Sequence, residues 1–116
     1  MLPWPTELRL NGARALLTVG FDDGKSFALP AEYLRVESPS AEVKGHAPGQ
    51  GKTVAGKRQV KIAELEPVGN YAVRIVFDDG HDTGLYSWTY LRTLGEEHAE
   101  KWAAYLEELA AQGLER

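Results

Sequence analysis

The sequence predicts an α+β domain with two similar halves, each a β-meander plus a short helix, followed by an amphipathic helix packed on the sheet. The first observation is an internal repeat: Phe-Asp-Asp-Gly recurs at 21–24 and 77–80, and Tyr-Leu-Arg recurs at 33–35 and 90–92. The second is that turn residues separate short apolar runs. The third is the helical spacing of apolar residues over 96–112. We therefore expect two copies of one supersecondary unit.

Composition limits the class of protein. The chain has 116 residues, 43% of them hydrophobic, a net charge of −4 and no cysteine. This is the composition of one globular domain over 1–116, and it excludes disulfides and thiolate catalysis. No apolar run reaches the roughly 18 residues that a membrane span needs, and the N-terminus lacks a signal-peptide pattern. We expect a cytoplasmic domain that does not contact membranes.

The first half is expected over residues 6–37. Asn11-Gly12 separates two apolar runs and predicts a tight type I′ hairpin, because both residues tolerate positive φ. Asp22-Asp23-Gly24 then turns the chain into a strand over 25–29. Pro30 suits the first turn of a short helix over 31–37, where its missing N–H is not needed.

The second half, residues 59–94, follows the same plan. Gly69-Asn70 and Asp78-Asp79-Gly80 are its two predicted turns. Ser87 is a suitable N-cap for a short helix that ends at Leu94. The expected strands cover 59–66, 71–77 and 81–86, and the second should bury Tyr71, Val73, Ile75 and Phe77 on one face.

The C-terminal helix is expected over 96–112, with Gly113 as its stop. His98 is expected on its charged, solvated side. The apolar positions that should face the core are Ala99, Trp102, Ala103, Leu106, Leu109 and Ala110.

A basic, glycine-rich loop over 38–58 joins the halves. Its segment 45–53 resembles a phosphate-binding loop, but five residues separate Gly45 from Gly51 where a Walker A motif has four. Its cations invite the hypothesis of an anion or nucleic-acid site over Lys44–Lys61, against the simpler interpretation of a solvated loop. The acidic net charge and the absence of RNA-binding motifs argue against nucleic acid. The cationic residues are Lys44, His46, Lys52, Lys57, Arg58 and Lys61.

His81 is the histidine with the most chemical potential, because Asp78, Asp79 and Asp82 lie near it in sequence. It could bind a metal or act as a base, although turn hydrogen bonding already explains the aspartates. The neighbouring aromatic residues form either a binding face or core, and no Ser-His-Asp arrangement is visible in the sequence. These aromatic residues are Trp4, Tyr86, Trp88 and Tyr90.

The motifs together resemble a known family. They include Phe-Asp-Asp-Gly at 21–24, Leu29-Pro30, Tyr-Leu-Arg at 33–35, Ser-Pro-Ser-Ala-Glu-Val at 38–43, Val-Gly-Asn-Tyr-Ala-Val at 68–73, Phe-Asp-Asp-Gly-His at 77–81 and Tyr-Ser-Trp at 86–88. From about residue 5 to 94 the chain resembles the N-terminal domain of gamma-butyrobetaine hydroxylase and its stand-alone bacterial relatives, a domain of unknown function. The resemblance implies a small α+β module.

The resemblance also implies a degenerate metal site. In the hydroxylases a zinc ion is held by three cysteines and one histidine, which would fall at Ser38, Ser40, Val43 and His81 of this chain. Serine is a poor zinc ligand and valine is none, so we expect no zinc and no cofactor, with iron at His81 left open. The hydroxylases' iron and 2-oxoglutarate chemistry belongs to a separate catalytic domain, so the resemblance implies no such activity.

We therefore expect a non-catalytic binding or adaptor module with a protein partner. Related domains are fused to Mrp-type ATPases that carry iron–sulfur clusters, which implies a link to iron–sulfur or metal metabolism. The expected surface comprises Arg35, the 38–58 loop with His46 and Lys52, and His81 with Trp88 beside it. Two alternatives stay open. One is a small-molecule binder or small enzyme that uses His81, Asp82 and Tyr86. The other is an anion or nucleic-acid binder through Lys44–Lys61.

Overall fold

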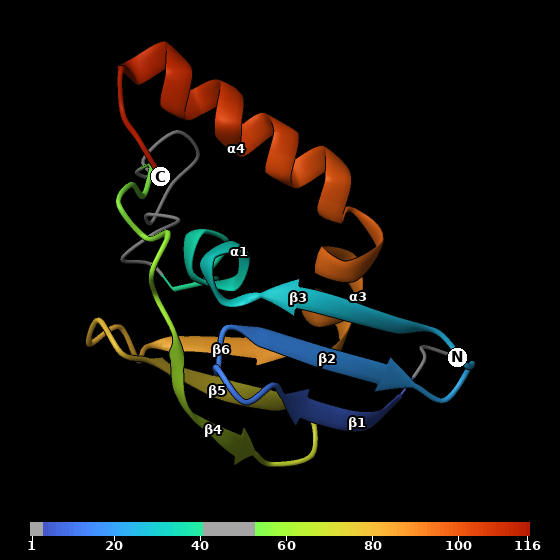
Figure 1. Cartoon of the computed structure of the whole chain (residues 1–116). Coiled ribbons are helices and arrows are strands. Elements are labelled where there is room, and N and C mark those ends of the chain that lie inside the picture. The colour runs from blue at the N-terminus through green and yellow to red at the C-terminus, as the bar shows by residue number, and fades with distance from the viewer. Residues whose placement is uncertain (1–3, 41–52) are drawn as a thin grey trace.

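The computed structural model describes residues 4–40 and 53–116, which form two three-stranded antiparallel sheets and three helices around them (Figure 1). This confirms the predicted α+β class. The first sheet holds β1 (Pro5–Leu10), β2 (Leu16–Phe21) and β3 (Ser26–Pro30), followed by α1 (Ala31–Val36). The second holds β4 (Ile62–Val68), β5 (Ala72–Phe77) and β6 (Gly84–Ser87), followed by α3 (Trp88–Glu96) and α4 (His98–Gln112).

Each sheet has the strand order of a meander, β1-β2-β3 and β4-β5-β6. The two Asp-Asp-Gly turns also have the same backbone geometry. Gly24 and Gly80 have φ of +87° and +92°, and their N–H groups donate to Phe21 O at 3.1 Å and Phe77 O at 3.2 Å. Glycine suits both turns because an L side chain is strained at such φ. The internal repeat as such stays a prediction.

The first hairpin differs from the prediction of a tight type I′ turn, which is wrong. The connection spans 11–15, and Arg14 rather than Gly12 has positive φ, at 60°. Arg14 N donates to Asn11 O at 3.0 Å, while Asn11 Oδ1 accepts from Ala15 N at 2.9 Å. The same conformation lets Arg14 Nε donate to Ile62 O at 2.8 Å, so the loop ties the first sheet to the second.

The alternation predicted in β5 is confirmed at three of its four positions. Val73, Ile75 and Phe77 are buried, and the main core gathers around them. The prediction that Tyr71 joins them is wrong, since it belongs to the turn before β5 and is 55% exposed. Gly69 has a φ of +55° and forms a turn that includes Tyr71, so β5 begins only at Ala72.

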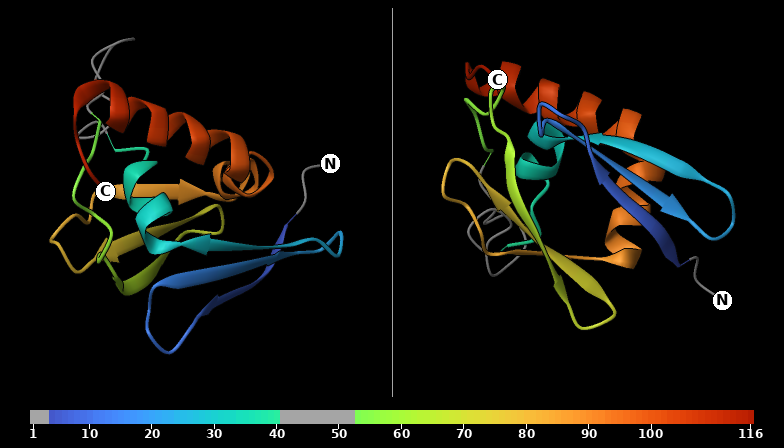
Figure 2. Two further views of the ribbon diagram at one scale, coloured as in Figure 1. Left: turned by 45° about the horizontal axis from the view of Figure 1, so that its top comes forward. Right: turned by 60° about the horizontal axis from the view of Figure 1, so that its bottom comes forward.

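The helix α4 lies above α1 and above the segment that begins at residue 53 (Figure 2). Its buried residues are Tyr105 and Leu109, which form a second small core with Val36, Val54 and Ala55. Trp102 bridges this cluster to the main core. The helix ends at Gly113, whose left-handed φ of 68° confirms the predicted stop.

The buried face of α4 is rotated relative to the predicted one. Tyr105, absent from the predicted stripe, is buried and its hydroxyl donates to Val54 O at 2.6 Å, whereas Leu106 is 40% exposed. The expectation that His98 is solvated is also wrong. Its ring stacks on Tyr33 with 4.2 Å between ring centroids. Simple apolar spacing missed this face because two of its members, His98 and Tyr105, are amphipathic.

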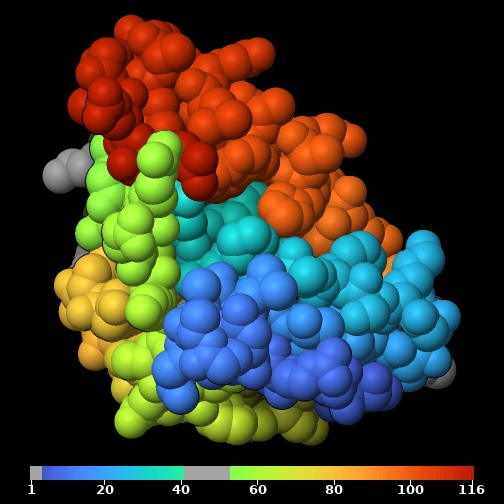
Figure 3. Space-filling model, in the orientation of Figure 1, coloured from blue at the N-terminus to red at the C-terminus, as the bar shows by residue number. Residues whose placement is uncertain are grey.

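The C-terminal residues fold back onto the body of the protein. Gly56 N donates to Glu115 O at 3.0 Å, and Figure 3 shows the C-terminal residues in red against the green segment that precedes β4. Arg116 pairs through Nη2 with the buried carboxylate of Glu32 on α1 at 2.8 Å. In the described part of the chain, none of the helices has both the length and the apolar character needed to cross a bilayer.

Candidate functional site

The centre of the candidate site is a contact between His81 and Ser38. The Nε2 atom of His81 lies 2.9 Å from Ser38 Oγ. Ser38 follows α1 and has no exposed surface, and His81 follows the turn after β5 and is 7% exposed. Positions separated by 43 residues in sequence are therefore joined by a buried hydrogen bond.

Ser40 lies beside this pair. Its backbone N–H donates to Ser38 Oγ at 3.3 Å, and its own hydroxyl is 2.7 Å from Thr83 Oγ1. Two of the three positions that the resemblance assigns to cysteine thus lie next to the histidine position. The third, Val43, lies outside the described residues.

The residues present do not fit a zinc ion. The donors at the two cysteine positions are neutral hydroxyls, and both already take part in hydrogen bonds with neighbouring groups. Zinc in proteins is held by thiolate, imidazole or carboxylate. Among residues 4–40 and 53–116, no group of three or more histidine and carboxylate side chains is arranged to hold a metal ion.

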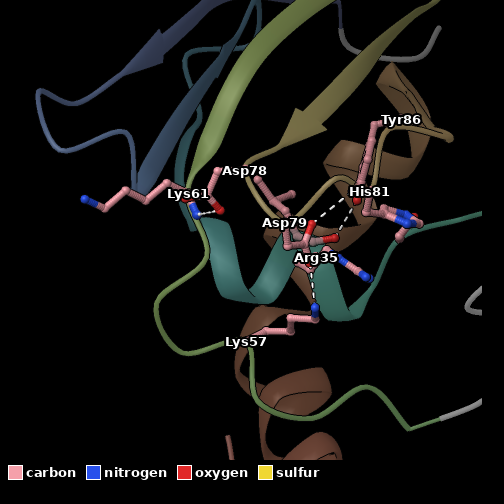
Figure 4. Close-up of polar contacts among 9 residues, drawn as sticks. Arg35, Lys57, Lys61, Asp78, Asp79, His81 and Tyr86 are labelled. Atoms are coloured by element: carbon pink, nitrogen blue, oxygen red, sulfur yellow. Dashed lines mark hydrogen bonds and ion pairs between the residues drawn. The ribbon is translucent and has the colours of Figure 1, made fainter.

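The site is bordered by a charged cluster centred on Asp79 (Figure 4). Its Oδ2 atom lies 2.9 Å from Arg35 Nε on α1 and 2.6 Å from Lys57 Nζ, and its Oδ1 accepts from His81 N at 3.1 Å. Burial by itself would raise the pKa of Asp79. The hydrogen bonds from Lys57, the His81 backbone and Arg35 outweigh it and lower the pKa to about 2.

Arg35 is mostly buried, with 12% of its side chain exposed. Its Nη1 atom is inaccessible to solvent and has no hydrogen-bond partner in the described structure. The guanidinium therefore has donor capacity beyond the Asp79 contact. It lies in the Tyr-Leu-Arg motif that the sequence analysis singled out.

Comparison with known proteins decides the family. The family model described as gamma-butyrobetaine hydroxylase-like, N-terminal, matches residues 8–92, which is most of the chain. The chain belongs to this family. No curated protein matches it.

Solved structures of similar proteins agree with the fold. Two NMR solution structures are 48% and 44% identical to the chain, with TM-scores of 0.84 and 0.86; they cover 99% and 100% of it, and it covers 86% and 91% of them. A crystal structure of a protein of unknown function in the DUF971 family, from Acidithiobacillus ferrooxidans, is 40% identical with a TM-score of 0.65. That match covers 78% of this chain and 91% of the other.

Within this gamma-butyrobetaine hydroxylase-like domain, Tyr86 also contacts Ser38, the partner of His81, whereas Asp82 and Trp88 contact other groups. Tyr86 has no exposed surface and donates its hydroxyl to Leu34 O, and burial raises its pKa. Asp82 Oδ2 lies 3.4 Å from Arg74 Nη1. Trp88 Nε1 donates to Asn70 O at 2.8 Å. His46 and Lys52 lie outside the described residues.

Sequence reasoning missed the role of the turn aspartates. It assigned them to local turn hydrogen bonding, which Asp79 and Asp23 do provide at His81 N and Lys25 N. It did not predict that Asp79 also forms ion pairs with Arg35 and Lys57. The Tyr-Leu-Arg motif was a usable signal for Arg35, but nothing in the sequence specified Lys57 as the second cation.

Proposed function

We propose that this domain is a non-catalytic binding module that recognises a protein partner at the face formed by Arg35, the residues that follow α1, and the turn between β5 and β6. The observation that carries the proposal is the buried hydrogen bond between His81 Nε2 and Ser38 Oγ. The groups that would hold a metal in the family's cysteine-containing members here bond one another. A partner would therefore recognise this face by its shape, its charges and its hydrogen-bonding groups rather than through a metal ion.

The charges of this face favour a protein partner whose surface carries both positive and negative charges. Asp82 keeps about half of its side chain exposed beside Arg74, and Lys57 keeps 24% exposed beside Asp79. Exposed, partly neutralised pairs of this kind supply orientation and specificity at interfaces more than raw affinity. We propose an iron–sulfur carrier of the Mrp type as the partner, on the association described for related domains, and we expect the domain to work in the cytoplasm.

The alternatives have less support in the described contacts. A small enzyme that uses His81, Asp82 and Tyr86 needs these groups to converge on one pocket. His81 and Tyr86 both contact Ser38, but Asp82 pairs with Arg74, and neither of the two hollows found among the described residues is lined by any of the three. The anion site over Lys44–Lys61 loses part of its charge because Lys57 is paired with Asp79.

The experiment is isothermal titration of the purified domain with a purified Mrp-type carrier, both without and with its cluster, and with metal analysis of the domain. We expect binding that Asp82→Lys weakens about tenfold or more. The control is Asp22→Lys, which reverses a charge in the corresponding turn of the other half and should leave affinity unchanged. Absence of binding to either form of the carrier contradicts the proposed partner, and stoichiometric metal in the domain contradicts the non-metal site.

A further inference from the structure

A second surface, which the proposed function does not use, lies where the start of β1 faces the start of α3 (Figure 2). A hollow of about 420 Å³ separates residues 4–8 from Asn70 and Trp88, and its wall is mostly apolar. We call it the tryptophan hollow, after Trp4 and Trp88, which come from the two halves of the chain. The face proposed for the partner lies at the opposite end of β5, roughly 20 Å away along the strand, so the two surfaces are separate.

Both tryptophans are anchored by hydrogen bonds. Trp4 N donates to Asp22 Oδ1 at 3.1 Å, and Trp4 O accepts from Asp22 N at 2.8 Å, which ties this residue to the first Asp-Asp-Gly turn. Trp88 N donates to Tyr71 O at 3.0 Å, and Trp88 Nε1 donates to Asn70 O at 2.8 Å. A ligand therefore meets two indoles on residues that are already held in place, which lowers the entropic cost of binding.

The tryptophan hollow offers hydrogen-bond donors to a ligand. The Trp4 side chain is 50% exposed, and its indole N–H forms no hydrogen bond with the part of the chain that the structure describes. Within the same described residues, the Thr6 hydroxyl and the Asn70 side-chain amide also form none. All three groups can donate. A ligand that combines apolar surface with hydrogen-bond acceptors therefore complements this wall.

The dimensions of the hollow select a narrow, extended occupant. Residues 4–8 span about 13 Å at about 3.3 Å per residue. A volume of about 420 Å³ over this length leaves a cross-section roughly 6 Å wide, whereas an α-helix with its side chains is about 10–12 Å wide. Asn70 and Trp88 close the far side, which leaves no space for the sheet of another molecule. A single chain in the polyproline II conformation needs no ladder of hydrogen bonds and rises about 3.1 Å per residue, so about four residues fit.

We propose that the tryptophan hollow binds a proline-rich segment of a partner protein in the polyproline II conformation. Prolines present apolar rings to the indoles, and they present carbonyl acceptors without N–H groups to the donors of the hollow. Glu7, whose side chain is 47% exposed, favours a cationic residue beside the prolines. Its own pair with Arg9, at 3.4 Å, is exposed and weak, so a cation of the ligand can replace Arg9.

The experiment is NMR titration of the isotope-labelled domain with three capped peptides. The first has eight prolines between two lysines, the second has eight prolines between two glutamates, and the third has alternating glycine and serine between two lysines. We expect the first peptide to shift the indole N–H signals of Trp4 and Trp88. The signal of Trp102, the third tryptophan, which packs on Tyr105, should not move. The glutamate peptide should bind about two- to fivefold more weakly, and the glycine–serine peptide about tenfold or more.

Variants locate the bound peptide. Trp4→Ala should weaken binding of the lysine-ended peptide about tenfold or more, with the folded state checked by circular dichroism. Leu106→Ala, which shortens an exposed leucine of α4 outside the tryptophan hollow, is the matched control and should bind like the wild type. Indole signals that do not move at millimolar peptide overturn the proposal, as do equal affinities for the proline and glycine–serine peptides. Wild-type affinity of Trp4→Ala overturns it too. Indole shifts on dilution of the domain alone would also overturn it, because a second copy would then fill the hollow.

Discussion

His81 and Ser38 form a buried hydrogen bond of 2.9 Å between Nε2 and Oγ, and Ser40 N donates to the same Oγ atom at 3.3 Å. Ser38, Ser40 and His81, three of the positions that the resemblance assigns to a metal site, thus lie close together. Thiolates placed at the two serine positions would therefore lie near the imidazole of His81.

We therefore predict that Ser38→Cys with Ser40→Cys creates a metal site. Two thiolates and the His81 imidazole supply three ligands, and water can complete a tetrahedral ion. Titration with Co²⁺ should produce thiolate-to-metal absorption bands that the wild-type protein lacks. Adding His81→Ala to the double variant should weaken Co²⁺ binding about tenfold or more. An unchanged spectrum on titration of the folded double variant would show that the closeness of these positions is insufficient.

The Asp79 cluster predicts a specific acid dependence. The folded-state pKa of Asp79 is lowered from 3.8 to about 2, mainly because hydrogen bonds from Lys57, His81 N and Arg35 exceed the effect of burial. The folded protein then binds this proton less readily than the unfolded chain. The stabilisation of about 2 kcal/mol is complete above pH 3.8 and is lost as the pH falls toward 2.

Urea unfolding measured at several pH values checks this dependence. Asp79→Asn should lower the free energy of unfolding at neutral pH and should flatten its slope between pH 4 and pH 2. Asp22→Asn, which removes a carboxylate from the Asp-Asp-Gly turn of the other half, is the control. Equal slopes for wild type and Asp79→Asn would mean that the cluster contributes no net stabilisation.

Sequence patterns predicted those features that depend on local physics. The Asp-Asp-Gly turns, the Ser87 cap and the Gly113 stop are each set by a few adjacent residues, and the structure has all three. Predictions failed where a distant contact decides the local conformation. Arg14 adopts positive φ while its side chain reaches Ile62, and His98 turns inward onto Tyr33.

The candidate site was predictable only through the family resemblance. That comparison placed Ser38 and Ser40 with His81 before any distance was known, and the structure brings these positions together. Spacing alone could not do so, because 43 residues separate Ser38 from His81. The ion pairs of Arg35 and Lys57 with Asp79 are likewise tertiary contacts that join three separate segments of the chain. No periodicity or motif in the sequence predicts them.

The helix α3 contains a glycine that close packing requires. A Cβ atom built on Gly95 would lie 2.5 to 2.8 Å from three ring atoms of Phe27 on β3. Gly95→Ala gains up to about 1 kcal/mol of helix propensity, but overpacking against a ring held in the core costs about 1 to 3 kcal/mol. We expect a net loss of stability in thermal or urea unfolding.

A double-mutant cycle separates the two effects of this substitution. In a Phe27→Ala background the clash is gone, so Gly95→Ala should become neutral or stabilising. A Gly95→Ala change that is equally destabilising in both backgrounds would locate its cost elsewhere than in the contact with Phe27.

His98 predicts a second pH dependence, in a different range. Its ring stacks on the buried Tyr33 ring at 4.2 Å with an interplanar angle of 18°, and burial lowers its pKa below 6.5. The unfolded chain therefore takes up this proton more readily than the folded protein. As the pH falls below 6.5, the free energy of unfolding should decrease until the folded state is protonated as well.

His98→Phe tests this prediction because it keeps an aromatic ring on Tyr33 and removes the titrating group. The difference in unfolding free energy between variant and wild type should grow as the pH is lowered from 7 through 6.5, in favour of the variant. Using this difference cancels the contributions of the other two histidines. NMR titration of the wild-type His98 ring protons should give a midpoint below 6.5, and a midpoint above it would reverse the predicted sign.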